Sequence, residues 1–410
     1  MQRTERCNDK PKERPRLEIA DVLRAHGEAY RRRYVLTPEQ HKVFWNLQAC
    51  RTELLGGHLD ICNGCGHTVP AYNSCRDRHC PKCQSLEQAR WVLQRMERIL
   101  PVPYFHVVFT VPGELQPLAR RNRRVFYSLL FKAASQTLLE LGRDEQRLGA
   151  TLGVTAVLHT WTRKLQFFPH VHCIVTGGGL ALDGSRWTRP RYDGKFLFPV
   201  FVLSKLFRGK FLAFLDRAIK RGEITLGDGG EADELERQAF ATLRDKLYRK
   251  KWVAYAKRPF AGPEQVFRYL GLYTHRVGIS NHRLQSMEDG EVTFGTKAGG
   301  TETVTGVEFV RRFLQHVLPK GFRKIRHYGL HAPGNVATKL ETARQLLESE
   351  GLSVADTTPK APTTWEELLE RLTGEDPTSC PKCKTGVLVR HSVDRATGEV
   401  RPPRIPEPDT

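Results

Sequence analysis

Two histidines in one short apolar stretch constrain this chain more than any other feature. The stretch runs Phe168-Pro169-His170-Val171-His172-Cys173-Ile174-Val175 and has the composition of a β-strand. Successive strand side chains point to opposite faces, so His170 and His172 share one face. Val171, Cys173 and Val175 share the other face, which we expect to be core. Two imidazoles on one face can bind a single metal ion.

A third histidine precedes this stretch. His159 lies in a run that predicts a strand over residues 154–162. If this strand pairs antiparallel with the strand over 169–176, His159 reaches the same face as the pair. Three ligands with open positions favour a catalytic metal site over a structural one. A packed or hydrogen-bonded histidine is the alternative for His159, with Gln166 or an acid elsewhere as the third ligand.

Two tyrosines are spaced for one face of a helix. Tyr269 and Tyr273 lie in a segment that begins with Gly262-Pro263 and that we expect to end at Gly278. A pair of core aromatics is the commoner meaning of this spacing. A phenol with a pKa of about 10 is a poor nucleophile at neutral pH. A divalent metal on a scissile phosphate makes the phosphorus more electrophilic, so that tyrosine can displace the 3′-OH and keep the 5′ phosphate. Such a transesterification needs no ATP, and the chain has no P-loop motif.

Half of the ten cysteines lie between residues 62 and 83. In a reducing compartment such crowding indicates metal binding rather than disulfides. Two Cys-x2-Cys pairs are expected to bind one tetrahedral Zn²⁺ through four thiolates: Cys62, Cys65, Cys80 and Cys83. A second, interleaved zinc site could use another set: Cys50, His58, Cys75 and His79. Near the C-terminus, Cys380-x2-Cys383 is half a site. We favour a degenerate knuckle there over one that borrows ligands from a partner.

The charge of the chain favours a polyanionic partner. Lys and Arg number 65 against 45 Asp and Glu, a net charge of +20, and the pI is about 9.7. Nucleic acid is the first candidate, ahead of a membrane surface or a basic face kept for solubility. We expect DNA contacts from basic residues of the cysteine segment and of a later patch: Arg76, Arg78, Lys82, Arg120, Arg121, Arg123 and Arg124. No secretory signal and no apolar run of about 18–20 residues is present, so we expect a cytoplasmic protein.

Composition and periodicity predict four regions. We expect a flexible basic tail over 1–16, a helical and zinc-binding DNA-recognition domain over 17–100, a catalytic domain over 101–335, and a C-terminal helix with a proline-rich tail over 336–410. Within the catalytic region we expect strands over 104–111, 154–162 and 169–176 and helices over 114–142, 203–220 and 233–248. Asp289-Gly290 predicts a hairpin between 279–286 and 291–297.

Together these motifs resemble the HUH endonucleases, and in particular the two-tyrosine rolling-circle transposases of bacterial insertion sequences. The resembling stretches are His58 to Gln84, Tyr104 to Pro112, His159 to Gly179, and Tyr269 to Arg283. The resemblance implies an α+β fold, an antiparallel sheet flanked by helices, with an N-terminal helical and zinc-binding module. By position, His170 and His172 match the metal ligands and Tyr269 and Tyr273 the nucleophiles. The last stretch adds two expected DNA contacts: Arg276 and Arg283.

The resemblance also implies partners and cofactors. It implies a catalytic Mg²⁺ or Mn²⁺ beside the structural Zn²⁺, and single- and double-stranded DNA at element ends and target in the bacterial nucleoid. Mn²⁺ suits imidazole better than Mg²⁺, which prefers oxygen. The sequence departs from the family at Phe168, where such proteins often carry another histidine. Two other functions stay open: a replication initiator or relaxase with the same chemistry, and a non-catalytic zinc-ribbon DNA-binding protein, such as a decayed element product.

Overall fold

The chain folds into two compact units, each built from separate stretches. The computed structural model describes residues 15–96, 98–191, 194–227, 234–257, 278–297, 299–352, 364–393 and 400–401. The first unit comprises Met1–Arg90, Ile279–Leu314 and Ala361–Thr410, and the second comprises Trp91–Gly278 and Gln315–Lys360. This division differs from the expected regions 101–335 and 336–410. The stretch 279–314 leaves the catalytic region because its helix packs against the N-terminal helix of the first unit.

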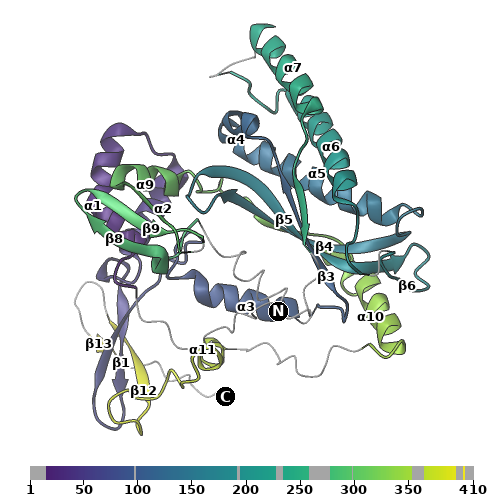
Figure 1. Cartoon of the computed structure of the whole chain (residues 1–410). Helices are drawn as coiled ribbons and strands as arrows, with labels where there is room; N and C mark the ends of the chain where they lie inside the picture. The colour runs from purple at the N-terminus through teal and green to yellow at the C-terminus, as the bar shows by residue number, and fades with distance from the viewer. Residues whose placement is uncertain are drawn as a thin grey trace. The chain divides into compact units, whose positions relative to one another are not determined.

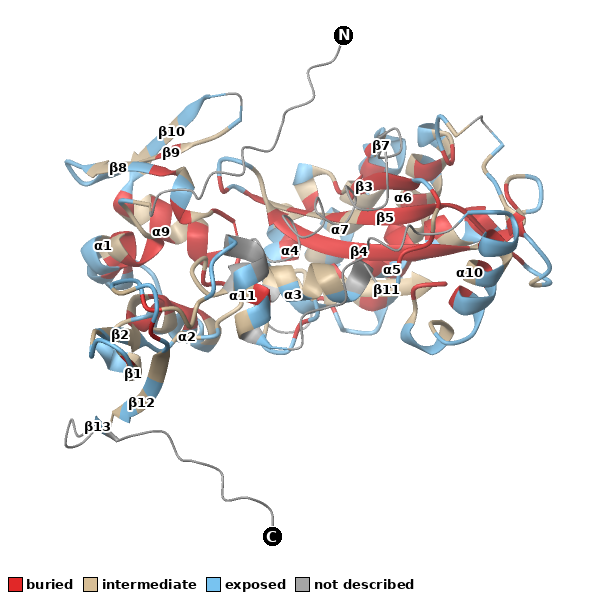
Figure 2. Ribbon diagram, turned by 90° about the horizontal axis from the view of Figure 1, so that it is seen from below, coloured by how far each residue is buried: buried red, intermediate tan, exposed pale blue. Residues whose placement is uncertain are grey.

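A six-stranded antiparallel sheet forms the centre of the second unit (Figure 1). Its main path runs β11-β4-β5-β3-β7, and β6 pairs with β5. The strands are β3 (Tyr104–Thr110), β4 (Ala150–Trp161), β5 (Phe167–Ala181), β6 (Trp187–Thr188), β7 (Ala254–Lys257) and β11 (Ile325–Gly329). The expected strands are therefore present, and β5 with the two histidines is central. Figure 2 shows β4 and β5 as the most continuously buried elements of the unit.

Helices cover both faces of this sheet. The larger core joins one face to α4 (Gln116–Arg121), α5 (Arg123–Arg143), α6 (Val200–Lys220) and α7 (Glu234–Arg249). The predicted helix over 114–142 is broken at Asn122, whose side chain binds the carbonyl of Thr225 at 2.8 Å. A smaller core on the other face places Ile174 of β5 against α10 (Lys339–Ser349). Ile174 follows His172 by two residues, so this core and the histidines share a face.

The first unit combines helices with two small sheets. Its helices are α1 (Ile19–Arg33), α2 (Pro38–Ala49), α9 (Gly306–Leu314) and α11 (Trp365–Thr373), and α3 (Gln84–Met96) spans the boundary between the units. One sheet has the order β13-β12-β1-β2, from β1 (Gly57–Cys62), β2 (Thr68–Tyr72), β12 (Leu388–Val393) and β13 (Val400–Arg401). The other has the order β10-β9-β8, from β8 (Leu284–Glu288), β9 (Glu291–Gly295) and β10 (Thr301–Thr305).

Short connections complete both units. They include the 3-10 turns Glu53–Leu55, Gly113–Leu115, Asn281–Arg283 and Pro333–Asn335. The predicted hairpin at Asp289-Gly290 is confirmed: both residues have positive φ, 50° and 79°, as its tight turn requires. Thr37 caps α2, because its hydroxyl accepts from the amide of Gln40 at 3.3 Å. Among the described residues, no helix is both long and apolar enough to cross a membrane.

Candidate metal centres and catalytic site

Three imidazoles meet on one face of the central sheet. His159 of β4 lies directly opposite His170 of β5, and His172 follows two residues later on the same face. The ring centres are 5.5 Å apart for His159 and His170, 4.3 Å for His159 and His172, and 4.9 Å for His170 and His172. One ring nitrogen from each lies within 4.8 Å of the others. The antiparallel pairing on which the expected third ligand depended is therefore present.

The protonation of these rings suits metal binding. The carbonyl of Phe168 can only accept, so His170 donates to it through Nδ1 at 2.7 Å and keeps the lone pair on Nε2. Burial lowers the pKa of His170 to about 4. Burial, with the neighbouring His159 and His170, also lowers the pKa of His172 well below its usual value. At neutral pH both rings are neutral, which is the form that binds a metal ion.

A fourth histidine, which the sequence analysis missed, contacts this group. His106 of β3 is 2% exposed. Its Nε2 lies 2.8 Å from Nδ1 of His172, and the two rings stack with centres 5.0 Å apart. The strand register explains the contact. β3 is the other neighbour of β5, and Val108 of β3 lies opposite His172. His106 precedes Val108 by two residues, so it lies on the same face and diagonal to His172. The signal in the sequence was a histidine inside an otherwise apolar strand, His106 in Tyr104–Thr110.

Aromatic and polar groups fix the turn beside the histidines. The ring of Trp161 stacks on His159 at 4.8 Å. Buried His316 donates to the carbonyl of Leu165 at 3.0 Å, so its Nδ1 accepts from the hydroxyl of Thr160 at 3.1 Å. Gln166, the alternative third ligand, is exposed in this turn. Among the described residues, no carboxylate belongs to the histidine group.

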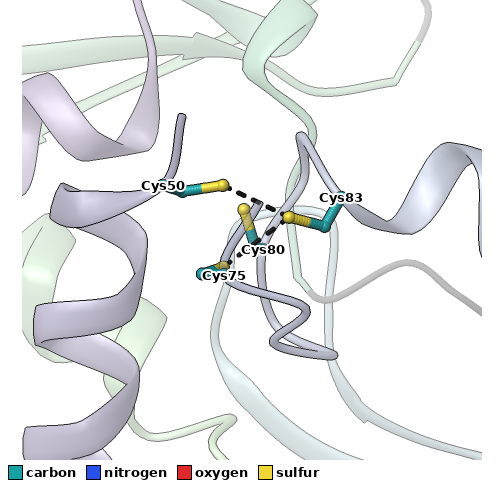
Figure 3. A group of neighbouring side chains, drawn as sticks. All are labelled: Cys50, Cys75, Cys80 and Cys83. Carbon is teal, nitrogen blue, oxygen red and sulfur yellow. Dashed lines mark hydrogen bonds between the residues drawn. The ribbon is translucent and has the colours of Figure 1, made fainter. Parts of the chain in front are cut away.

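Four thiols of the first unit form a compact cluster (Figure 3). The cluster contains Cys50, Cys75, Cys80 and Cys83. The sulfur of Cys83 lies 3.2 Å from that of Cys50 and 3.6 Å from that of Cys75. Hydrogen bonds from the other three thiols lower the pKa of Cys83. The thiol of Cys75 lowers the pKa of Cys50 to about 7 in the same way. Four converging sulfurs could hold a tetrahedral Zn²⁺.

The structure corrects the expected grouping of the cysteines. Cys62 and Cys65 do not join Cys80 and Cys83; their sulfurs meet those of Cys380 and Cys383 instead. Cys62 and Cys65 lie at the turn of the β1–β2 hairpin, and β2 then leads the chain away from this turn before it reaches Cys80 and Cys83. The C-terminal Cys-x2-Cys pair is therefore no isolated remnant, contrary to the reading that we favoured.

The histidines proposed for the second zinc site have other contacts. His79 is buried, and its Nδ1 lies 2.9 Å from the carboxylate of Asp77. Burial alone would raise the pKa of Asp77, but hydrogen bonds from His79 and Asn46 lower it to about 2. His58 lies on β1 and faces Asp60 at 3.6 Å. Neither histidine belongs to a metal-ligand group of the described residues, so the set with Cys50 and Cys75 is wrong in its histidines.

The basic residues expected to bind DNA have mixed surroundings. Arg76 is exposed and has a positive φ of 51°. Burial lowers the pKa of Arg78, and Lys82 forms an ion pair with Glu18 at 2.7 Å. Arg283 donates to the carbonyl of Gly295 at 2.8 Å.

The later patch, Arg120 to Arg124, is partly used to hold loops of its own unit. Arg121 donates to the carbonyl of Leu226 at 2.6 Å and Arg123 to that of Val317 at 3.2 Å. Arg124 donates to the carbonyl of Lys320. Arg120 lies over the ring of Phe167 at 5.1 Å. Arg120, Arg121 and Arg124 remain exposed, so their charges stay available at the surface.

The expected nucleophiles Tyr269 and Tyr273 lie outside the described residues, as does Arg276. The described residues on either side of that segment lie against the central sheet and against the turn between β4 and β5. Lys257, at the end of β7, pairs with His106. A Cβ on Gly278 would lie 3.1 Å from the side chain of Leu165 and 3.6 Å from that of His316.

Comparisons with known proteins identify the family of the chain. Residues 153–339 match a family model described as "Putative transposase" (Y2_Tnp), and residues 22–111 match a "Transposase zinc-binding domain" (Zn_Tnp_IS91). The chain is 44% identical over 395 residues to "Putative transposase y4qJ" of Sinorhizobium fredii (strain NBRC 101917 / NGR234), covering 94% of this chain and 97% of that protein. The chain belongs to this transposase family. It is also 27% identical over 303 residues to the "Transposase for insertion sequence element IS801" of Pseudomonas savastanoi pv. phaseolicola, covering 69% of this chain and 68% of that protein.

The candidate site residues of the transposase are distributed between the stretches that the two family models match. The zinc-binding model contains all four thiols of the cluster around Cys83, and also His106. The larger model contains the three histidines and the positions of both tyrosines. Membership of the family implies that this protein binds DNA and cuts or transfers it. Cys380 and Cys383 lie beyond both models.

Proposed function

We propose that this transposase nicks and transfers single-stranded DNA by attack of a tyrosine on a phosphodiester, as in rolling-circle transposition of an insertion sequence. The bond from phosphorus to the 3′ oxygen breaks, and a bond from the phenol oxygen to the 5′ phosphate forms. The proton of the phenol is lost, and the leaving 3′ oxygen gains one. The observation that carries the proposal is the convergence of His159, His170 and His172 on one sheet face.

The donor set fits a divalent cation that imidazoles can bind, Mn²⁺ in preference to Mg²⁺. When bound, such a cation polarises the scissile phosphate and offsets the charge that develops there. Three protein ligands leave further positions for phosphate oxygens, which suits catalysis better than structure. The low pKa of His170, about 4, keeps its ring neutral across the physiological range.

The surrounding residues hold the ligands in place. The carbonyl of Phe168 fixes the tautomer of His170. We assign a similar role to His106, which receives a hydrogen bond from Nδ1 of His172 when Nε2 of His172 faces the cation. Neighbours of this kind orient metal ligands and raise their basicity. Trp161 packs on His159 and excludes water from one side of its ring.

We assign the nucleophiles to Tyr269 and Tyr273, which are four residues apart, so that two phosphotyrosine linkages can form in sequence. Two described positions support this assignment. Lys257 pairs with His106, Gly278 lies against Leu165 in the turn between β4 and β5, and the chain that joins them carries both tyrosines. The cysteine cluster around Cys83 is assigned a structural Zn²⁺, and exposed basic residues are assigned to hold the DNA of element ends and target.

The test is formation of a covalent adduct. Labelled single-stranded oligonucleotides that carry the ends of the encoding element are incubated with the full chain and Mn²⁺, then separated under denaturing conditions. Tyr269→Phe with Tyr273→Phe should form no adduct, since each change removes only the hydroxyl. Tyr248→Phe, at an exposed position of α7, is the matched control and should behave as wild type. An adduct that survives in the double variant contradicts the assignment.

One described tyrosine is a rival nucleophile. Tyr255 of β7 is exposed and pairs with Val108, which in turn pairs with His172, so it lies on the histidine face. Tyr255→Phe should keep the adduct if the later tyrosines react. Loss of the adduct in this variant alone would move the nucleophile to β7. His170→Ala or His172→Ala should abolish cleavage and leave binding of the same oligonucleotide within about twofold of wild type, a small change on the affinity scale.

A further inference from the structure

Four thiols from opposite ends of the chain meet in the first unit. Cys62 and Cys65 lie at the end of β1 and the turn after it, and Cys380 and Cys383 precede β12. The sulfurs of Cys62 and Cys383 are 3.7 Å apart, and those of Cys65 and Cys380 are 3.8 Å apart. Thiolates at 2.3 Å from a tetrahedral Zn²⁺ would be about 3.8 Å from one another. The spacing is thus that of a four-sulfur metal site, and is longer than the ~2.05 Å of a disulfide.

The two halves of this cluster repeat the same turn. The amide of Gly66 donates to the carbonyl of Cys62 at 3.0 Å, and the amide of Lys384 donates to the carbonyl of Cys380 at 3.0 Å. Gly66 and Lys384, each four residues after its first cysteine, have positive φ of 68° and 63°. A positive φ is uncommon at a lysine. Two unrelated segments thus adopt one conformation that turns both of their thiols to the same point.

Backbone amides are directed at the sulfurs. The amide of Cys65 donates to the sulfur of Cys62 at 3.4 Å, and the amide of Gly386 donates to the sulfur of Cys383 at 3.2 Å. Hydrogen bonds of this kind stabilise negative charge on sulfur, and the thiolate is the form that binds a metal.

The two halves are also joined directly. The amide of Asn63 donates to the carbonyl of Val387 at 3.0 Å, and the amide of Val387 donates to the side-chain oxygen of Asn63 at 2.9 Å. A Cβ on Gly386 would lie 2.4 Å from the sulfur of Cys62, so only glycine permits this approach. The pairing continues from this point, where Cys62 lies opposite Leu388 in the sheet of β1 and β12.

We propose that Cys62, Cys65, Cys380 and Cys383 bind a second structural Zn²⁺, which fastens the C-terminal strand β12 to the N-terminal hairpin. Half of its ligands lie outside the matched zinc-binding domain, which ends at residue 111. The ion closes a loop between residues that are 321 positions apart, Cys62 and Cys383. The ion thereby joins an N-terminal segment to a C-terminal one, and the chain between them includes the unit with the three histidines.

The experiment counts metal in the full chain. Native mass spectrometry and elemental analysis of protein purified without chelator should give two zinc ions per chain. Cys380→Ser with Cys383→Ser should give one, and so should Cys75→Ser with Cys80→Ser. The matched control is Cys173→Ala, because Cys173 is buried in the central sheet and belongs to neither cluster; this variant should keep two. Two zinc ions in the Cys380/Cys383 variant, or iron at this site, would overturn the proposal.

A milder variant keeps the test decisive if the double variant fails to fold. Cys380→His preserves a four-ligand set that zinc accepts. In protein loaded with ¹¹³Cd, wild type should give two resonances in the four-sulfur range, and Cys380→His should move only one of them. A single cadmium resonance in wild type contradicts the proposal. A dimeric mass in wild type that becomes monomeric in the Cys380/Cys383 variant would also contradict the proposal, because the metal site would then lie between two chains.

Discussion

At the scale of single residues, the site depends on which ring nitrogen of each histidine carries the proton. A carbonyl decides this for His170, through its contact with Phe168. For His172 the partner is another histidine, His106, which can accept or donate. Only one of the two arrangements keeps the lone pair of His172 on Nε2, where it can bind a metal, namely the one in which His106 accepts. We therefore expect His106 to affect the proposed metal site without being a ligand.

This leads to the first prediction. His106→Ala should weaken Mn²⁺ binding by about 10–100-fold, the range found when partners of metal ligands are removed. His106→Gln should restore part of the affinity, because its side-chain oxygen can accept the same hydrogen bond. Mn²⁺ titration followed by electron paramagnetic resonance measures the affinity without DNA. His327→Ala is the matched control on the edge strand β11, outside the histidine group. Unchanged Mn²⁺ affinity in His106→Ala would limit this residue to packing.

At the scale of elements, α9 carries a network of ion pairs, most of them within the helix and one to β10. The carboxylate of Glu308 accepts from Arg311 at 2.6 Å and 2.7 Å and from Arg312 at 2.8 Å. Arg312 also reaches Glu302 of β10 at 3.0 Å. The hydrogen bonds from Arg311 and then Arg312 lower the pKa of Glu308 to about 2. Since this pKa is below that of the unfolded chain, the contribution to stability is complete above pH ~4.5 and is lost as the pH falls toward 2.

The second prediction follows from that sign. Glu308→Gln should lower the free energy of unfolding at pH 7 by about 1–2 kcal/mol, after allowance for solvent screening. The difference from wild type should stay constant above pH ~4.5 and shrink as the pH falls from ~4.5 toward 2. Glu28→Gln is the control. Glu28 also pairs with an arginine of its own helix, Arg32, but its side chain is 69% exposed, against 30% for Glu308. Urea unfolding of all three proteins at each pH gives the comparison, and a difference that grows on acidification would reverse the assigned sign.

At the scale of the whole molecule, the sequence predicted local features better than long-range partners. The strand with His170 and His172, the pairing of His159 and the turn at Asp289 all followed from short-range spacing. Short-range spacing did not predict which cysteines join each Cys-x2-Cys pair. Such a pair supplies two metal ligands, and its sequence does not indicate which residues supply the other two. The contact that decides between Cys80 and Cys380 as partners of Cys65 spans 315 positions. Only the path of β1 and β12 through the fold brings the correct pair together.

The same limit applies to the boundaries between regions. Composition placed 279–314 with the catalytic region because it follows the tyrosines in sequence. In the structure this stretch packs against the N-terminal helices, and Asn281 accepts a hydrogen bond from the amide of Ile19 at 3.2 Å. Where the chain passes from one unit to the other and later returns, its amino-acid composition does not change in a way that would reveal the boundary. His106 was missed for a related reason, since its importance lies in the strand that it adjoins.

The last prediction concerns the net charge of +20. Basic groups that neutralise Z phosphates of single-stranded DNA give a slope of about −0.7Z for log affinity against log salt. With several patches engaged we expect a slope of about −4 or steeper, measured by fluorescence anisotropy on a labelled oligonucleotide.

Arg121 and Arg124 also donate hydrogen bonds to backbone carbonyls, so loss of packing must be separated from loss of charge. Arg121→Lys with Arg124→Lys should keep the slope, whereas Arg121→Gln with Arg124→Gln should make it shallower by about 0.7 for each lost contact. Arg221→Gln is the control, because this residue is exposed and lies 3.8 Å from Glu223. A nearly flat profile in wild type would mean that the charge serves something other than DNA, and equal slopes in the Gln and Lys variants would remove this patch from the interface.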